Sequence, residues 1–347
     1  MSMLLMAMLK AAAWTVGVMG LLLAAGWLSE RWAERRQLRR YPPPGRLVDV
    51  GGRRLHLLEK GDAPGPTVVI EQGAGGPAVF WWPVQDAVAR FARVCVYDRA
   101  GMGWSDPVRR SRSMSERVAE LHRLLHAAGV PGPYVLVGHS YGGPLISLFA
   151  RDYPDETAGL VFADTPDMES LLGPSYQTTT RKFHLPFART MAFASRFGIL
   201  RLVTLVAPRL NMAPGELPPA VRRAARASRR AVAWDAAVDD LVSFRAVPSA
   251  DRRPLAPGAL GDKPVGVISH TVPFPGPFAP LEEDFEPSQA RLMALSSNSL
   301  QVRPPGAGHS VELDVPEATA ETIRRVYEAA RDGMQMTPRA VPLTNVA

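Results

Sequence analysis

The sequence predicts an α/β fold with a mostly parallel central sheet, helices on both faces, a helical cap insertion and an N-terminal transmembrane helix. Three observations lead to this prediction. Short β-branched runs alternate with segments of helical periodicity, about a hundred residues with few strand signals interrupt that alternation, and a long uncharged run stands near the amino terminus. With 347 residues, 46% of them hydrophobic, the chain is long enough for one such domain and an extra N-terminal piece.

The extra piece is the apolar run of residues 11–28, which reads AAAWTVGVMGLLLAAGWL and carries no charge. At about 1.5 Å per residue it nearly crosses a hydrocarbon layer of ~30 Å, and Trp14 and Trp27 stand near its ends. A cleaved signal peptide is the alternative, but its apolar core is usually only ~7–15 residues long and a small-residue cleavage site should follow. We therefore predict an uncleaved anchor over residues 1–30 that binds the membrane through residues 11–28.

A basic and proline-rich linker is predicted next, over residues 31–45. It contains five arginines and ends in YPPPG. By the positive-inside rule, this flank predicts a single-pass protein with its folded domain in the cytoplasm. The net charge of +7 comes with scattered arginines and no binding motif, so no nucleic-acid partner is expected.

The core of the domain is predicted over residues 46–165 and 264–331. It opens with a hairpin around Gly51 and Gly52, after which strands and helices alternate. Residues 332–347 are predicted to be a flexible tail. Strands are expected at 47–50, 53–58, 67–70, 94–97, 134–137, 159–163, 264–268 and 300–303, and helices at 82–91, 113–128, 144–150 and 316–330.

Residues 138–142 read GHSYG and fit the pattern G-x-S-x-G. They follow a predicted strand and precede a helical run, the context in which a serine leaves a strand on a strained turn. Gly138 and Gly142 lack the Cβ atoms that would clash with the strand and the helix at this turn. Ser140 is therefore the candidate nucleophile.

Four motifs follow predicted strands along the chain: GAGG at 73–76, YDRAGMGWS at 97–105, GHSYG at 138–142 and PGAGH at 305–309. Together, over roughly residues 45–331, they resemble the α/β-hydrolase superfamily. The resemblance implies a serine nucleophile, a late histidine base and an acid that lies between them in sequence.

His309 is the predicted base, because it follows the last strand in a Gly-rich loop and imidazole titrates near neutral pH. His270, at the end of a strand, is a minor alternative. His122 and His126 lie one helical turn apart, but no glutamate or third ligand accompanies them in the sequence as a zinc helix requires, so no metal site is predicted.

The oxyanion of an acyl-transfer reaction needs preorganised donors, usually two backbone N–H groups. The resemblance assigns them to Tyr141 and Ala74. The chain departs from the family pattern at Gln72 and Gly73, where the family often has His-Gly.

The acid that orients the base has several candidates. Family members usually carry it after the strand that is 264–268 here, yet residues 269–276 contain no acid. A family variant places it one strand earlier, where Asp164 stands. We favour Asp164, because a strand end fixes a side chain better than a Pro-rich loop; the alternatives are Glu282, Glu283 and Asp284.

Residues 166–263 are predicted to form a helical cap, because 187–205 and 219–247 have helical spacing. In the family such a cap shapes the substrate pocket. Its apolar side chains either line that pocket or pack the cap onto the core, and both interpretations stay open. The residues in question are Met191, Phe193, Phe197, Ile199, Leu200, Leu202, Val203 and Leu205.

The resemblance implies a serine hydrolase that cleaves an ester or related acyl bond through an acyl-enzyme. With the predicted anchor and the apolar cap, we expect a membrane-anchored enzyme that acts on an apolar small molecule. A peptidase, an amidase and a C–C bond hydrolase use the same machinery and remain alternatives. A non-catalytic binding member is the third class, and the presence of Ser140 and His309 in their expected loops argues against it. No cofactor is implied, and the expected partners are a small-molecule substrate and the membrane.

Overall fold

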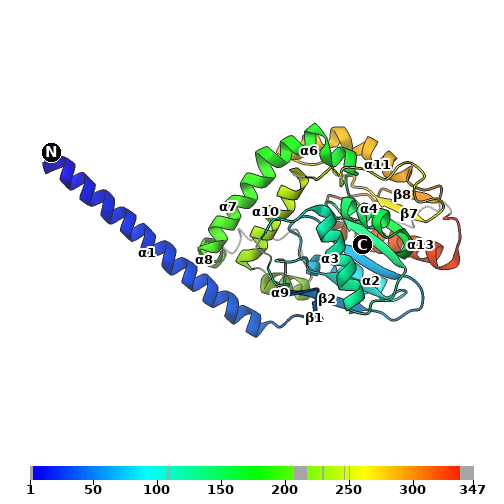
Figure 1. Cartoon of the computed structure of the whole chain (residues 1–347), viewed down its shortest axis with the longest axis horizontal. Coiled ribbons are helices and arrows are strands. Elements are labelled where there is room, and N and C mark those ends of the chain that lie inside the picture. The colour runs from blue at the N-terminus through cyan, green and yellow to red at the C-terminus, as the bar shows by residue number, and fades with distance from the viewer. Residues whose placement is uncertain are drawn as a thin grey trace.

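The computed structural model describes residues 3–107, 110–206, 217–228, 230–245, 247–249 and 251–336. A long helix, α1 (Met3–Arg40), projects from a body that is built around one sheet (Figure 1). The described part of the chain ends at residue 336, just after helix α13 (Pro316–Asp332). Most of the predicted tail, residues 337–347, lies outside the described residues.

The sheet has eight strands in the order β1-β2-β4-β3-β5-β6-β7-β8. β1 and β2 form the predicted hairpin, β2 is antiparallel to β4, and all other neighbours are parallel. The prediction of a mostly parallel sheet is therefore confirmed. The strands are β1 (Arg46–Asp49), β2 (Arg54–Lys60), β3 (Thr67–Glu71), β4 (Val94–Tyr97), β5 (Tyr134–His139), β6 (Thr157–Ala163), β7 (Val265–Ile268) and β8 (Ser299–Val302).

Helices cover both faces of this sheet, which explains why its central strands are apolar on both sides. On β5, Leu136 belongs to one core cluster, and Val135 and Val137 belong to the other. The first cluster lies under α3 (Met114–Ala127) and α4 (Gly142–Asp152), and the second under α2 (Trp82–Val88) and α13. The period of two along a strand therefore places alternate side chains in separate cores.

The described part of the chain between β6 and β7 contains helices and no strand, in the segment predicted as a cap, and its residues 247–249 and 251–264 form turns and irregular chain. It arches over the core, with α7 packed against α10 (Figure 1). A π-helical turn, η3, joins α6 to α7. Such turns are rare in proteins, and those that occur are often found at functional sites. The elements are α5 (Met168–Leu172), α6 (Pro174–Thr179), η3 (Thr180–His184), α7 (Leu185–Arg196), α8 (Ile199–Val206), α9 (Pro219–Ser228) and α10 (Ala231–Arg245).

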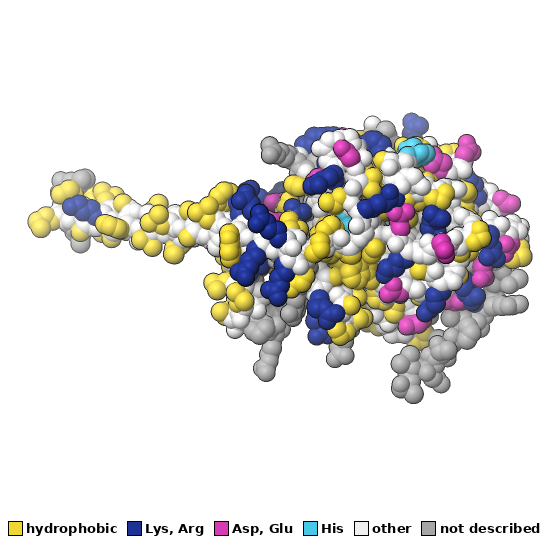
Figure 2. All heavy atoms as spheres, turned by 90° about the horizontal axis from the view of Figure 1, so that it is seen from below, with side chains coloured by type: hydrophobic (Ala, Val, Ile, Leu, Met, Phe, Trp, Pro, Cys, Tyr) yellow, Lys and Arg dark blue, Asp and Glu magenta, His cyan; other side chains and the backbone are white. Residues whose placement is uncertain are grey.

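Among the described residues, α1 is the one helix long and apolar enough to cross a membrane, with a mean hydropathy of 1.7 in its apolar window and none of that window buried. Length and composition make it a candidate span, and a signal sequence has the same properties. The helix continues to Arg40, so residues 31–40 of the predicted linker are helical. Figure 2 shows hydrophobic side chains along the free part of this helix, with Lys and Arg side chains gathered where it meets the body.

Candidate active site

Ser140 lies on the sharp turn between β5 and α4. Its φ of 50° falls in the left-handed region, which is costly for a residue with a Cβ. Among the described residues, Asp164, with φ of 47°, is the one other non-glycine residue there. Asp164 directly follows β6, the neighbour of β5, so the two strained residues stand at the same edge of the sheet. Strain of this kind is typical of functional sites.

The glycines around Ser140 are needed for close packing. A Cβ on Gly138 would lie 2.6 Å from the carbonyl oxygen of Gly142, and one on Gly142 would lie 2.3 Å from that of Glu71. A Cβ on Gly143 would lie 2.0 Å from Oγ1 of Thr165. The steric role predicted for Gly138 and Gly142 is confirmed.

The segments that follow β5, β6 and β8 bring Ser140, Asp164 and His309 together. His309 Nε2 lies 3.1 Å from Ser140 Oγ, and His309 Nδ1 lies 2.7 Å from Asp164 Oδ2. When Nδ1–H donates to the carboxylate, Nε2 is left to accept the proton of the serine hydroxyl. The arrangement is one that can activate a serine.

The carboxylate of Asp164 is fully enclosed. Its other oxygen, Oδ1, accepts hydrogen bonds from the backbone N–H of His270 at 2.7 Å and lies 2.8 Å from His270 Nδ1. Burial raises the pKa of Asp164, but the hydrogen bonds from His270 and His309 outweigh it and lower the pKa to about 2. Asp164 is therefore a carboxylate at neutral pH.

His270 bridges two carboxylates. Its Nε2 lies 3.2 Å and 3.3 Å from the two oxygens of Glu282, which belongs to the 3₁₀ helix η5 (Gly276–Asp284). Burial lowers the pKa of His270, but the hydrogen bonds with Asp164 and Glu282 outweigh it, so the pKa is raised. A protonated imidazole can donate to both carboxylates at once.

The structure also shows where the three alternative acids of the sequence prediction lie. Glu282 contacts His270, whereas among the described residues the carboxylate that contacts His309 is that of Asp164. Glu283 is exposed, and the backbone carbonyl of Asp284 accepts a hydrogen bond from Ser170 Oγ at 3.3 Å. Sequence analysis missed the role of His270. The available signal was its place just after β7, where the family usually carries its acid.

Two backbone N–H groups, those of Ala74 and Tyr141, lie near Ser140, and neither has a hydrogen-bond acceptor among the residues that the structure describes. The loop that carries Ala74 lies against Ser140, because a Cβ on Gly73 would come 3.2 Å from the Cβ of Ser140. These are the donors that the resemblance assigns to an oxyanion hole.

A buried arginine and a cap aspartate hold that loop. Arg99, 2% exposed, donates to the carbonyl oxygens of Gln72 and Gly73, each at 2.6 Å, and to Asp240 of α10 at 2.8 Å. Asp240 also accepts from the backbone N–H of Gly75 at 3.1 Å. The side chain of Gln72 bonds to the carbonyl of Tyr97. Core and cap therefore both fix the backbone that carries Ala74.

Ser140 and His309 are both partly accessible to solvent. Ser140 is half-buried, and the side chain of His309 is 38% exposed. The ring of Phe274 lies 5.2 Å from that of His309, and the ring of His139 lies 4.9 Å from it. Aromatic groups thus border an imidazole that is partly exposed to solvent.

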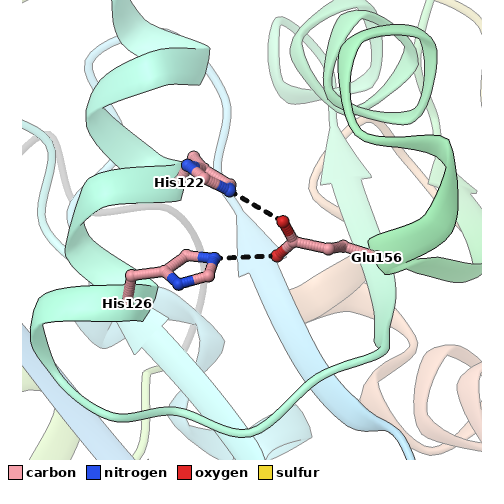
Figure 3. Close-up of side chains that lie close together, drawn as sticks. All are labelled: His122, His126 and Glu156. Atoms are coloured by element: carbon pink, nitrogen blue, oxygen red, sulfur yellow. Dashed lines mark hydrogen bonds and ion pairs between the residues drawn. The ribbon is translucent and has the colours of Figure 1, made fainter.

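A second group of two histidines and a carboxylate lies elsewhere (Figure 3). The Nε2 atoms of His122 and His126 lie 2.8 Å and 2.9 Å from the two oxygens of Glu156. Their ligand atoms fall within 4.8 Å of one another, and the donor set suits Zn²⁺. The carboxylate accepts a hydrogen bond from each ring, which accounts for the group without an ion. It stands before β6, at the edge of the parallel strands opposite to Ser140.

The sequence model of the α/β hydrolase fold matches residues 66–197. A curated relative, the "Probable transporter efuK" of Hormonema carpetanum, is 36% identical over 126 residues, which are 34% of this chain and 18% of that protein. Other curated relatives are likewise matched over less than half of their length.

Two solved structures show the same fold over most of the chain. A bacterial membrane phospholipase A has a TM-score of 0.58 at 20% identity, over 96% of this chain and all of the other. An esterase from Thermogutta terrifontis has a TM-score of 0.59 at 22% identity, over 82% of this chain and 98% of the other. With the sheet order and the strained serine after β5, these matches show that the chain has the α/β-hydrolase fold.

Proposed function

We propose that this protein is a membrane-anchored serine hydrolase that cleaves an ester or a related acyl bond of an apolar small molecule. The observation that carries the proposal is the contact of strained Ser140 with His309, 3.1 Å between Oγ and Nε2, backed by a buried Asp164. Structural neighbours named esterase and phospholipase support a hydrolytic reaction on an ester.

In the first half of the reaction, Ser140 Oγ attacks the substrate carbonyl carbon while His309 Nε2 takes the hydroxyl proton. The ionised Asp164 stabilises the imidazolium that forms. The oxyanion of the tetrahedral intermediate accepts hydrogen bonds from the N–H groups of Tyr141 and Ala74. The intermediate then expels the alkoxide, which leaves as an alcohol with the proton from His309, and the acyl group stays on Ser140.

In the second half, His309 removes a proton from a water molecule, which attacks the acyl carbon. The same N–H groups hold the second oxyanion. When it collapses, Ser140 Oγ leaves with the proton from His309, and the acid product is released. The chain's own groups supply every proton transfer, and the serine returns to its starting state.

The anchor and its orientation belong to the proposal. Residues 11–28 form the apolar part of α1, and exposed arginines follow it at positions 31, 35, 36, 39 and 40. The positive-inside rule then puts the body in the cytoplasm. A C-terminal fusion to green fluorescent protein, which folds poorly outside the cytoplasm of bacteria, tests this: fluorescent cells are expected, and dark cells with full-length fusion would reverse the orientation.

The reaction is tested with p-nitrophenyl esters of increasing acyl length, hydrolysed by the full-length protein in detergent. We expect turnover that rises with acyl length and a fluorophosphonate adduct on the peptide that contains Ser140. The Ser140→Ala variant should lose both turnover and adduct. Turnover that survives in this variant would refute the nucleophile, and a preference for acetyl esters would refute the apolar substrate.

A further inference from the structure

Helix α8 of the cap has an apolar face that the body does not cover. None of its residues is buried, and Leu202, Leu205 and Val206 are 59%, 74% and 73% exposed. Ile199 is 40% exposed. The sequence left two roles open for Ile199, Leu202 and Leu205, lining a pocket or packing the cap, and their exposure fits neither. Contiguous exposed apolar side chains mark a surface that binds a partner or a membrane. We call these four residues the α8 face.

Helix α1 docks beside this face through an ion pair whose carboxylate is buried. Glu30 of α1 is only 5% exposed, and its two oxygens each accept a hydrogen bond from Arg201 of α8 at 2.8 Å. Arg201 also donates to the side chain of Gln37 at 3.2 Å. A bidentate pair of this kind fixes direction as well as distance, so the position of α8 relative to α1 is set.

A glycine brings the two segments into backbone contact. A Cβ on Gly26 of α1 would lie 2.4 Å from the carbonyl oxygen of Phe197, the residue that directly follows α7. A larger residue at position 26 would push the cap away. The start of α8 therefore lies level with residues 26–30 of α1, where the apolar run ends.

Charged and aromatic side chains mark that level as a membrane interface. Arg31 stacks over the ring of Trp27 at 4.8 Å, and Arg36 over that of Trp32 at 5.3 Å. Tryptophan and arginine are typical of the headgroup region. Figure 2 shows hydrophobic side chains beside a group of Lys and Arg side chains at this junction.

We propose that the α8 face is a second membrane contact, which dips into the interfacial layer of the bilayer that α1 spans. The inference rests on the proposed anchor and deepens the proposed function. Helix α7 runs from α8 to the π-helical turn η3, where His184 stacks on Phe278 of η5 at 4.8 Å. The cap thus links the bilayer surface to the segments around the candidate site. The substrate class is an amphiphilic ester that resides in the bilayer.

Fluorescent labels on the full-length protein in phosphatidylcholine–phosphatidylglycerol vesicles test the proposal. Cysteine is introduced at Leu205 of the α8 face, at Val18 of α1, or at exposed Arg324 of α13 as the control. The native Cys95 can stay, because it is 1% exposed and burial raises the pKa of its thiol to about 12. Each variant carries an NBD group, and doxyl-labelled lipids are the quencher.

We expect doxyl lipids to quench the labels at 18 and 205 severalfold and to leave the label at 324 unchanged. If the label at 18 is quenched but the label at 205 is as little affected as the one at 324, the inference about the α8 face is wrong, while the anchor stands. A label at 18 that is not quenched would overturn the anchor itself. A label at 205 that is shielded from water, is not quenched and crosslinks to another copy would show a contact between two copies instead.

Activity supplies an independent readout. Leu205→Glu places a charge on the α8 face without disturbing buried groups, and Thr204→Glu, exposed on the same helix, is the matched control. We expect Leu205→Glu to lower hydrolysis of a long-chain ester in vesicles severalfold relative to the control. Hydrolysis of a water-soluble short ester should be equal in both variants. An equal rate on vesicles too would contradict a role for this face in taking up the substrate.

Discussion

The two groups of histidine and carboxylate at opposite ends of the sheet have nearly the same hydrogen-bond geometry. His309 lies 2.7 Å from Asp164, and His122 lies 2.8 Å from Glu156. Their surroundings differ: the side chain of Asp164 is 0% exposed, and that of Glu156 is 32% exposed. Only the first group stands next to a strained serine. The comparison teaches that burial and a strained neighbour, rather than a short contact, distinguish a candidate catalytic pair.

Burial acts through the dielectric around the charge. In a low-dielectric site, a carboxylate that accepts several hydrogen bonds stays charged and interacts strongly with an imidazolium. At an exposed site the same pair is screened by water and contributes little. We therefore expect equivalent substitutions at the two groups to have very different effects.

The largest difference is expected for the histidines. His309→Gln removes the proposed base and should lower kcat by roughly 10⁴-fold, as loss of a triad member does. His122→Gln makes the same chemical change at the other group and should leave kcat within about twofold, because its contacts lie away from Ser140. Steady-state hydrolysis of a p-nitrophenyl ester measures both. Comparable losses in the two variants would break the comparison.

A smaller effect is expected for the second partner of each carboxylate. His270→Gln removes an imidazole hydrogen bond from the ionised carboxylate of Asp164, and a hydrogen bond to a charged group contributes about 1.5–3 kcal/mol, so kcat should fall roughly 10- to 100-fold. KM should change little, because His270 acts through Asp164. The matched change, His126→Gln, should leave both constants as they are. If His270→Gln altered KM alone, its role would lie in substrate binding.

Each of the two groups contributes to the stability of the folded protein, and these contributions should be lost at opposite ends of the pH range. The pKa of His270 is raised, so its contribution is fully present below its ordinary value of about 6.5 and is lost as pH rises through the raised pKa. Burial raises the pKa of Glu156, but His122 and His126 outweigh it and lower the pKa. Its contribution is present above the ordinary value of 4.5 and is lost as pH falls through the lowered pKa.

Denaturant unfolding in detergent between pH 4 and pH 9 checks this pair of signs. The stability difference between wild type and His270→Gln should shrink on the alkaline side, whereas that between wild type and Glu156→Gln should shrink on the acid side. Differences that run in the same direction would show that one of the two protonation assignments is wrong.

The smallest effect is expected for Glu156→Gln at neutral pH. The pair is partly exposed, so its loss should cost about 0–1 kcal/mol of unfolding free energy. Activity should not change. A loss of several kcal/mol of unfolding free energy would mean that this surface group makes a large contribution to the stability of the fold.

Most of the fold, and two of the candidate site residues, could be predicted from short local patterns in the sequence. Ser140 and His309 stand in short motifs whose chemistry depends on neighbours in the chain, and the alternating runs indicated the parallel sheet. The support around them comes from distant segments. Asp240 reaches Arg99 across 141 positions, and no local pattern reveals such a pair.

Other contacts could not be predicted for the same reason, because their partners lie far apart in the sequence. Glu156 completes the group with His122 and His126 from 30 positions beyond His126. The ion pair of Glu30 with Arg201 spans 171 positions, so the docking of α1 on the cap was invisible in the sequence. The exposure of Leu202 and Leu205 was equally hidden, because an apolar helix pattern states which side chains share a face and not what covers it.

The central claim is that His309 is oriented by Asp164 and activates Ser140. The most direct test compares the rate of fluorophosphonate labelling of Ser140 in Asp164→Asn with that in Glu282→Gln, Glu283→Gln and Asp284→Asn. Asp164→Asn should label roughly 10⁴-fold more slowly than wild type, Glu282→Gln about tenfold more slowly through His270, and the other two at the wild-type rate. Fast labelling of Asp164→Asn, together with loss of labelling in one of the other three, would contradict the account.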